Sequence, residues 1–199
     1  MKVLIVYASK YGSTSGVAVA LGEALRAHGH HVDVHEVASA PTPDGYDAAV
    51  VGSGVYVGSW LKPASGYLET HAAPLRERPV WLFGVGPLGH DNPQPEGDIE
   101  QAGKLVELVG AREYRTLTGA LERSRLSFLD RLITRVVKAP DGDFRDWEAI
   151  RAWAHAIAST LEAGVGASTH GPRAASAATQ ASAAAGAAAF AAGSAGTRA

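Results

Sequence analysis

Short apolar runs and amphipathic stretches alternate along the first 162 residues of the chain. All-apolar runs such as Val3–Tyr7 and Val80–Phe83 are typical of parallel strands that are covered on both faces. Apolar residues that recur at helical spacing, as in Phe144–Leu161, indicate amphipathic helices. The pattern as a whole predicts strands over residues 3–7, 31–37, 46–51, 80–83 and 114–121, and helices ending near His28 and over residues 62–71, 99–109 and 144–161.

This alternation predicts the fold class. Five strands interleaved with helices favour an α/β fold built on a doubly wound parallel sheet. In such a sheet, ligands bind beyond the carboxyl ends of the strands, where the winding reverses. The segments that follow Tyr7, Gly52 and Gly84 are therefore where we expect binding residues.

The composition changes near Glu162. Of the 37 residues from Ala163 to Ala199, 17 are alanine and six are glycine, and only Arg173 and Arg198 are charged. Such a segment buries too little apolar surface to offset the entropy lost on ordering. We expect one domain over residues 1–162, followed by a disordered tail over residues 163–199.

The composition also excludes several classes of function. Without cysteine, the chain has no disulfide, thiolate metal site or iron–sulfur cluster. Its 18 basic and 20 acidic residues sum to −2, which argues against nucleic-acid binding. No apolar run approaches the ~20 residues that span a bilayer, and the N-terminus lacks a signal peptide, so we expect a soluble, cytoplasmic protein. The histidine-rich turn 28–31 has no acidic partner at a ligand spacing, and no metal site is expected.

The segment after the first strand is rich in hydroxyl side chains. It reads Ala8-Ser9-Lys10-Tyr11-Gly12-Ser13-Thr14-Ser15 and leads directly into a helix. Hydroxyl groups, a glycine and the free amides of a helix N-terminus can hold a phosphate. The same residue types also cap ordinary helices, so composition alone leaves both interpretations open.

The other two segments contain residues that could bind a planar ligand. Residues 53–60, interpreted as a loop, place Tyr56 and Trp60 among small residues, and either ring could stack on a flat group or pack on a helix. The run 84–89 matches the GxGxxG pattern, but Pro93, Pro95 and Gly97 follow it where that pattern requires a helix. A glycine-rich loop lying against a flat ring is the better interpretation.

Together these segments resemble the flavodoxin-like proteins, which bind FMN. The likeness lies in Leu4–Thr14 and in Tyr46–Ser53 with Tyr56 and Gly58. More narrowly, the chain is similar to the flavodoxin-domain group that includes the menaquinone-dependent protoporphyrinogen IX dehydrogenases. The narrower likeness rests on Gly119-Ala120-Leu121, on a basic amphipathic stretch after it, and on Asp146-Trp147-Glu148 opening the last helix.

The resemblance implies a five-stranded sheet in the order 2-1-3-4-5 and FMN as cofactor. It assigns the phosphate to one group of residues and the flavin ring to two others. The phosphate group is Ser9, Lys10, Tyr11, Gly12, Ser13 and Thr14; the ring groups are Ser53, Gly54, Val55, Tyr56 and Gly58, and Val85, Gly86, Pro87, Leu88 and Gly89. Tyr11 replaces a hydroxyl residue of many flavodoxins, so we expect its backbone amide to make the contact.

Residues 123–138 bear on the partner. They carry five basic groups and one acid, with apolar residues at helical spacing. Such a segment can pack on the sheet, or it can lie on an anionic membrane with its apolar face buried. In the resembling dehydrogenases the matching region is implicated in quinone or membrane contact, which would place the protein peripherally at the inner face of the cell membrane.

The resemblance implies an FMN-dependent oxidoreductase that passes electrons from a porphyrinogen to a quinone, with the redox chemistry on the cofactor. Two alternatives remain: an electron carrier serving redox protein partners, and a flavin-free binding or regulatory module. Carrier flavodoxins are usually strongly acidic, whereas residues 1–162 have a net charge of only −4. His90, beside the third segment, is a candidate proton donor.

Overall fold

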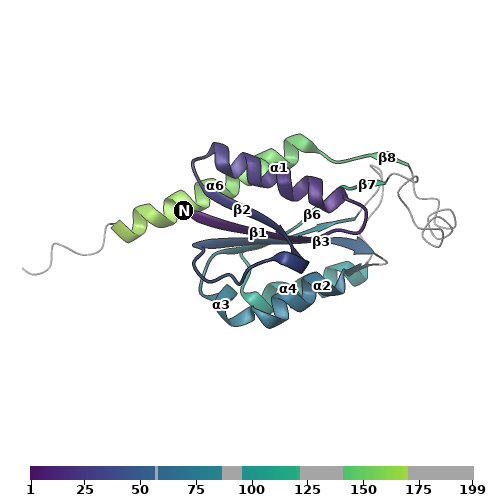
Figure 1. The fold of residues 1–199 in the computed structure, drawn as a ribbon, viewed down its shortest axis with the longest axis horizontal. Coiled ribbons are helices and arrows are strands. Elements are labelled where there is room, and N and C mark those ends of the chain that lie inside the picture. The colour runs from purple at the N-terminus through teal and green to yellow at the C-terminus, as the bar shows by residue number, and fades with distance from the viewer. Residues whose placement is uncertain (57, 87–95, 122–140, 170–199) are drawn as a thin grey trace, which may run out of the picture. The chain divides into compact units, whose positions relative to one another are not determined.

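The computed structural model describes residues 1–56, 58–86, 96–121 and 141–169. Its centre is a sheet of five parallel strands in the order β2-β1-β3-β5-β6 (Figure 1). Because the short strand β4 lies off this path, β5 and β6 are the fourth and fifth parallel strands of the chain, and the predicted fold class and the order 2-1-3-4-5 are confirmed. The five parallel strands are β1 (Lys2–Ala8), β2 (His31–Glu36), β3 (Ala48–Tyr56), β5 (Val80–Val85) and β6 (Glu113–Leu117). A two-residue strand, β4 (Ser59–Trp60), pairs antiparallel with β3.

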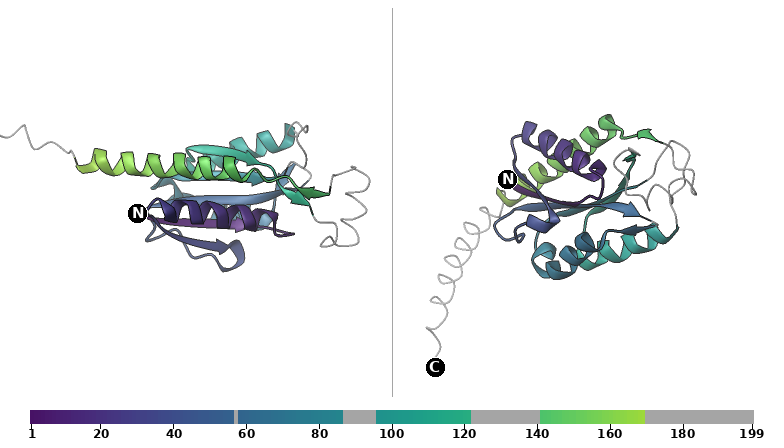
Figure 2. Two further views of the ribbon diagram at one scale, coloured as in Figure 1. Left: turned by 90° about the horizontal axis from the view of Figure 1, so that it is seen from above. Right: turned by 45° about the vertical axis from the view of Figure 1, so that its right-hand side comes forward.

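Helices cover both faces of this sheet. One face carries α1 (Ser13–Ala27) and residues 147–159 of α6 (Trp147–Thr169). The other carries α2 (Lys62–Thr70), α3 (Ala72–Arg76) and α4 (Glu96–Val109), and the two views of Figure 2 show the same arrangement. A short 3-10 helix, η1 (Val37–Ser39), follows β2. Because both faces are covered, the central strands are apolar along their length.

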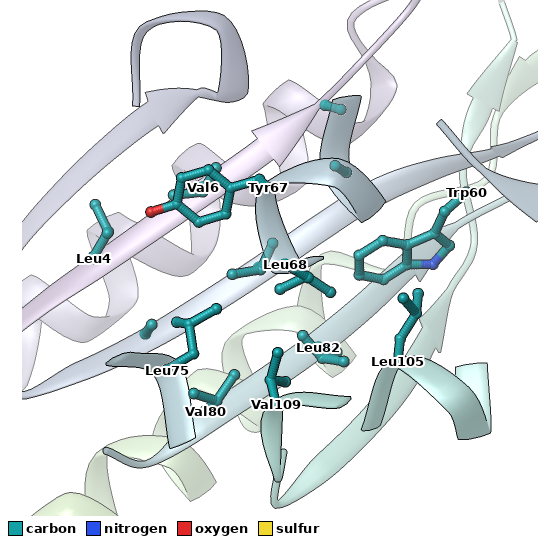
Figure 3. Packing of buried hydrophobic residues seen from close by; sticks show 14 residues of the cluster. Leu4, Val6, Trp60, Tyr67, Leu68, Leu75, Val80, Leu82, Leu105 and Val109 are labelled. Atoms are coloured by element: carbon teal, nitrogen blue, oxygen red, sulfur yellow. The ribbon is translucent and has the colours of Figure 1, made fainter. Parts of the chain in front are cut away.

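The core on the α2–α4 face is continuous. Leu68 of α2 and Leu75 of α3 lie with Val80 and Leu82 of β5, and all four are fully buried (Figure 3). Val109 closes the cluster from α4. Each fully buried side chain of this kind stabilises the fold by roughly 1.5–3 kcal/mol relative to an exposed one.

The opposite face is centred on aromatic packing. The Trp153 ring is fully buried and meets Phe83 edge-on, with ring centroids 6.0 Å apart. Its indole N–H donates to Glu113 Oε2 at 2.9 Å, so the one polar atom of this large side chain has an acceptor. Trp153 therefore belongs to the core, as its place on the apolar stripe of the last helix predicts.

Two strands differ from their prediction. The expected strand 114–121 is divided into β6 and a separate β7 (Ala120–Leu121), which pairs antiparallel with β8 (Gly142–Asp143). The division follows Gly119, whose carbonyl accepts the Phe144 N–H at 3.1 Å and so belongs to the new ribbon and not to the parallel sheet. The single-strand prediction for this segment was wrong.

The last helix begins later than its apolar pattern predicts. Asp146 ends the preceding loop, where its Oδ1 accepts the Ala149 N–H at 2.9 Å, the usual role of an N-cap residue. At the other end α6 continues past Glu162 to Thr169.

The chain divides into two compact units, Met1–Ser159 and Thr160–Ala199. The parallel sheet belongs entirely to the first unit. The disordered tail over residues 163–199 stays a prediction, since residues 170–199 lie outside the described part.

Within the described residues, no helix has the length and apolar character needed to cross a bilayer. The same residues contain no group of three or more histidine or acidic side chains placed to hold a metal ion.

Candidate cofactor-binding site

The three segments singled out in the sequence lie along one edge of the sheet. In the strand register, Ala8 of β1 stands beside Ser53 of β3, and Ser53 stands beside Gly84 of β5. The loops after β1 and β5 therefore leave the sheet on either side of β3. This is the edge at which a doubly wound sheet binds its ligands.

The loop after β1 ends in an open helix N-terminus. Gly12 has φ 88°, the left-handed conformation that glycine adopts without strain, and its N–H donates to Ser9 Oγ at 3.0 Å. No side chain caps α1, and its first turn contains no acid. The backbone N–H groups of the first turn thus point out of the helix with its positive dipole end, which suits a phosphate.

The hydroxyl groups of this turn have different surroundings. Ser13 Oγ accepts the N–H of Ala120 in β7 at 2.8 Å. Thr14 is buried, with 2% of its surface exposed. Ser15 Oγ donates to the Tyr7 hydroxyl at 3.2 Å. The predicted phosphate residues 9–14 are therefore contiguous and belong to one turn, with Ser13 additionally connected to the β7–β8 ribbon.

The expected second loop, residues 53–60, is mostly a hairpin, so that prediction was wrong. Strand β3 continues to Tyr56 because Val55 and Tyr56 find pairing partners in β4. Gly58, with φ 70°, supplies the left-handed residue of the turn. Ser53 is fully buried; its hydroxyl donates to Gly54 O and accepts the Leu61 N–H, both at 2.9 Å. Its side chain thus holds the hairpin in place.

Two glycines keep side chains out of the space between the strand ends. A Cβ at Gly54 would lie 3.2 Å from Thr14 Oγ1 of α1, and a Cβ at Gly86 would lie 2.7 Å from the Cβ of Val55. The Gly86 N–H donates to Leu117 O at 3.3 Å, which holds the start of the third loop against β6. Bare backbone at this edge lets a flat ligand approach closely.

The aromatic residues of the region fall into two groups. Trp60 is buried and donates its indole N–H to the Tyr114 hydroxyl at 3.1 Å, so it belongs to the core. Tyr56 is 36% exposed, and its ring lies 6.3 Å from that of Tyr11. Lys10 Nζ lies 5.3 Å from the Tyr11 ring centroid and 5.4 Å from that of Tyr56, within cation–π range of both.

Of the remaining predicted ring residues, Val85 is buried at the end of β5. Pro87, Leu88 and Gly89 lie outside the described residues, as does His90. What the sequence interpretation missed is the contact of Ser13 with β7. Ser13 and Ala120 are 107 positions apart, and a hydrogen bond over that distance produces no periodic pattern in the sequence. The one local feature that could have indicated a break in the strand at this point is Gly119.

These features fit the expected cofactor. A phosphate would be held by the open amides of the α1 N-terminus, with Lys10 supplying positive charge. A flat ring would lie beside the ends of β3 and β5, where Gly54 and Gly86 carry no side chain that could cover it. Tyr56 is the exposed aromatic residue at this edge, placed for stacking.

Comparisons with known proteins agree with this fold. A curated relative, protoporphyrinogen IX dehydrogenase [quinone] of Escherichia coli (strain K12), is 23% identical over 175 aligned positions, covering 79% of this chain and 95% of the relative. An archaeal flavodoxin structure is similar with a TM-score of 0.56 and 18% identity, over 81% of this chain and 99% of its own.

Rubredoxin oxygen:oxidoreductase from Desulfovibrio gigas also matches with a TM-score of 0.56 and 17% identity, over 82% of this chain but only 37% of that longer protein. The model of the flavodoxin domain family matches residues 4–148, well over half of the sequence. The chain therefore belongs to the flavodoxin domain family, which indicates FMN as its cofactor.

Proposed function

We propose that this protein is an FMN-dependent oxidoreductase that takes electrons from a porphyrinogen of the protoporphyrinogen IX type and passes them to a quinone. The observation that carries the proposal is the match to the Escherichia coli dehydrogenase, which extends over 95% of that protein and is not confined to the cofactor loops. Bound FMN supplies the electron transfer. The chain's own residues bind the cofactor, orient it and leave one side open to the reactant.

The open side is consistent with an anionic, ring-shaped reactant. Tyr56 is exposed beside Tyr11, and the ammonium group of Lys10 lies within reach of both rings. Aromatic rings favour flat or ring-shaped molecules, and the lysine charge that attracts the FMN phosphate also attracts carboxylates such as the propionates of a porphyrinogen. The modest net charge of residues 1–162 also supports an enzyme over an acidic carrier.

The test begins with the colour and the flavin spectrum of the purified protein. Protoporphyrinogen IX is then mixed with the FMN-loaded protein and a menaquinone analogue without oxygen, and porphyrin fluorescence is followed. We expect porphyrin to form together with the quinol, and a flavin-free Gly12→Asp variant to be inactive. A flavin-loaded protein that turns over with neither the quinone nor artificial acceptors would overturn the proposal and favour the electron carrier.

Contact with an anionic membrane through residues 123–138 belongs to the same proposal, because quinones are lipid-soluble. Those residues lie outside the described part, and the support is their sequence: five basic groups, one acid and apolar residues at helical spacing. We expect the protein to co-sediment with anionic vesicles at low salt and not with zwitterionic ones. Equal recovery with both vesicle types would count against electrostatic contact.

A further inference from the structure

Ser13 occupies a junction between two parts of the molecule. It is the first residue of α1, in the turn to which we assign the cofactor phosphate. Its Oγ also accepts the N–H of Ala120 at 2.8 Å, and Ala120 begins β7. One side chain therefore belongs both to the phosphate-binding turn and to the β7–β8 ribbon, which lies at the carboxyl-end edge of the sheet (Figure 1).

The hydrogen bond determines how the Ser13 hydroxyl can act. A serine hydroxyl has one proton to donate and two lone pairs to accept. The Ala120 N–H takes one lone pair, which fixes the position of the oxygen and leaves the proton for an acceptor on the open side of the turn. A phosphate oxygen is such an acceptor, and donation to an ionised group strengthens the bond. The Ala120 N–H, the Ser13 hydroxyl and the phosphate oxygen then form a row of two hydrogen bonds, and each polarises the other and strengthens it.

The ribbon is so small that a single hydrogen bond changes its stability measurably. It comprises two residues in each strand, with Ala120 opposite Asp143 and Leu121 opposite Gly142. Two-stranded ribbons of this size are marginally stable by themselves.

A second attachment to α1 lies on the β8 side of the ribbon. The Arg145 guanidinium pairs with Asp143 at 2.6 Å and packs so closely on Gly16 that a Cβ there would lie 2.3 Å from its Nη1. In the described residues the ribbon and the loop after it thus meet α1 at Ser13 and at Gly16, and Ser13 is the one in the turn assigned to the phosphate.

We propose that Ser13 is a positioning residue that couples occupancy of the phosphate site to the stability of the β7–β8 ribbon. A phosphate bound at the α1 N-terminus strengthens the Ser13–Ala120 hydrogen bond, and an ordered ribbon in turn presents the Ser13 hydroxyl to the phosphate. Since coupling between two equilibria is reciprocal, each stabilises the other by the same factor. The proposal rests on the FMN cofactor and is independent of the substrate.

Amide hydrogen exchange at Ala120 provides the test. The full chain is compared without FMN, with FMN, with inorganic phosphate, and with riboflavin, which has the ring but lacks the phosphate. We expect FMN and phosphate to slow exchange of the Ala120 amide by about fivefold, the lower end of ordinary coupling, and riboflavin to leave it unchanged. Equal protection by riboflavin, or none by FMN, would overturn the proposal.

Variants separate coupling from simple binding. At saturating FMN, Ser13→Ala should lose the protection of Ala120, whereas Ser13→Thr, which keeps the hydroxyl, should retain it. Ser9→Ala is the matched control: its hydroxyl holds the Gly12 N–H within the same loop and does not touch the ribbon. It should weaken FMN binding and leave the protection at saturation intact. Wild-type protection in Ser13→Ala would refute the assignment.

The reverse direction of the coupling is tested from the ribbon. Ala120→Pro removes the one N–H that Ser13 accepts. We expect FMN affinity, measured by quenching of flavin fluorescence, to fall about fivefold, with riboflavin affinity unchanged as the internal control. Unchanged FMN affinity would contradict the reciprocity. A protein that shows the coupling and yet fails to oxidise porphyrinogen would refute the proposed reaction alone.

Discussion

The two ends of the parallel sheet use polar residues in opposite ways. At the amino end, polar groups satisfy one another: the Tyr46 hydroxyl donates to Asp33 at 2.9 Å, and Lys2 pairs with the same carboxylate at 3.5 Å. Arg78 donates to the carbonyls of Pro43, Pro74 and Tyr46. At the carboxyl end, the first turn of α1 has no side-chain cap hydrogen bond and contains no acidic residue, so its backbone N–H groups are left for a ligand.

This difference separates stability from binding. Hydrogen-bonded polar groups at the amino end stabilise the fold and have little capacity left for a ligand. An uncapped helix end costs some stability, because no side chain accepts hydrogen bonds from its first N–H groups. Substitutions at the amino end should therefore change unfolding without changing FMN affinity, and substitutions at the carboxyl end should do the reverse.

The largest effect is expected at Gly12. Gly12→Asp places a carboxylate against the FMN phosphate, and the repulsion at a partly exposed site costs about 3 kcal/mol, or more than a hundredfold in affinity. Gly12→Asn is the matched control, because asparagine has the same shape and tolerance of positive φ without the charge. FMN titration of both variants checks the prediction, and equal affinities would contradict the phosphate assignment.

Arg78→Ala tests the amino end. Loss of a half-buried guanidinium that donates to three carbonyls should lower the free energy of unfolding by about 2–3 kcal/mol. Urea unfolding of the apo protein measures this change, with Arg78→Lys expected to fall between the variant and the wild type. FMN affinity should stay within twofold of the wild type at about 25 °C. A parallel loss of FMN affinity would break the separation between the two ends.

Lys10→Gln should have a smaller effect at the carboxyl end. Lys10 is exposed, so removal of its charge should weaken FMN binding by about threefold, in the range of surface ion pairs. Lys10→Arg keeps the charge and should bind FMN as the wild type does. The difference should shrink at high salt. A salt-independent loss would mean that the side chain acts through packing on Tyr11 and Tyr56 rather than through charge.

The smallest effect concerns acid stability at the amino end. The hydrogen bond from the Tyr46 hydroxyl holds the pKa of Asp33 below its ordinary value of 3.8. A carboxyl group with a lowered pKa stabilises the fold above that value and loses the contribution as pH falls through the folded-state pKa. Tyr46→Phe should cost less than about 1 kcal/mol at pH 7, because Asp33 is well exposed.

Unfolding of Tyr46→Phe and the wild type at neutral and strongly acidic pH checks this prediction, and the two should converge in acid. A difference that persists once Asp33 is protonated would show that the hydroxyl acts through some other contact.

The predictable part of this protein is the part encoded by local pattern. The buried runs Val3–Tyr7 and Val80–Phe83 are so apolar that only a covered parallel sheet accommodates them, and the strand order follows from the family that the first loop resembles. The succession of strand, hydroxyl-rich turn and helix around residues 9–14 was predictable for the same reason, since the three are consecutive in the chain; the phosphate site there stays a prediction.

Features that depend on distant partners were not predictable. Ser53 reads as a ligand-facing loop residue, yet it is buried and bonded to Leu61, because β4 extends the neighbouring strand. Two residues of β4 are too short to produce a pattern of their own. Likewise, the break between β6 and β7 depends on Ser13 and Phe144, which reach Ala120 and Gly119 from distant parts of the chain.

The pairing of Gly52 with Phe83 has a consequence for the history of this sheet. The two residues are opposite each other in β3 and β5, and a Cβ on Gly52 would lie 2.0–2.4 Å from three atoms of the Phe83 ring. The ring occupies the volume that the missing side chain leaves, so neither position can change alone without a clash or a void. In an alignment of descendants, we expect the two positions to covary, a larger residue at 52 arriving with a smaller one at 83. Divergence within this buried layer would then proceed by double replacements.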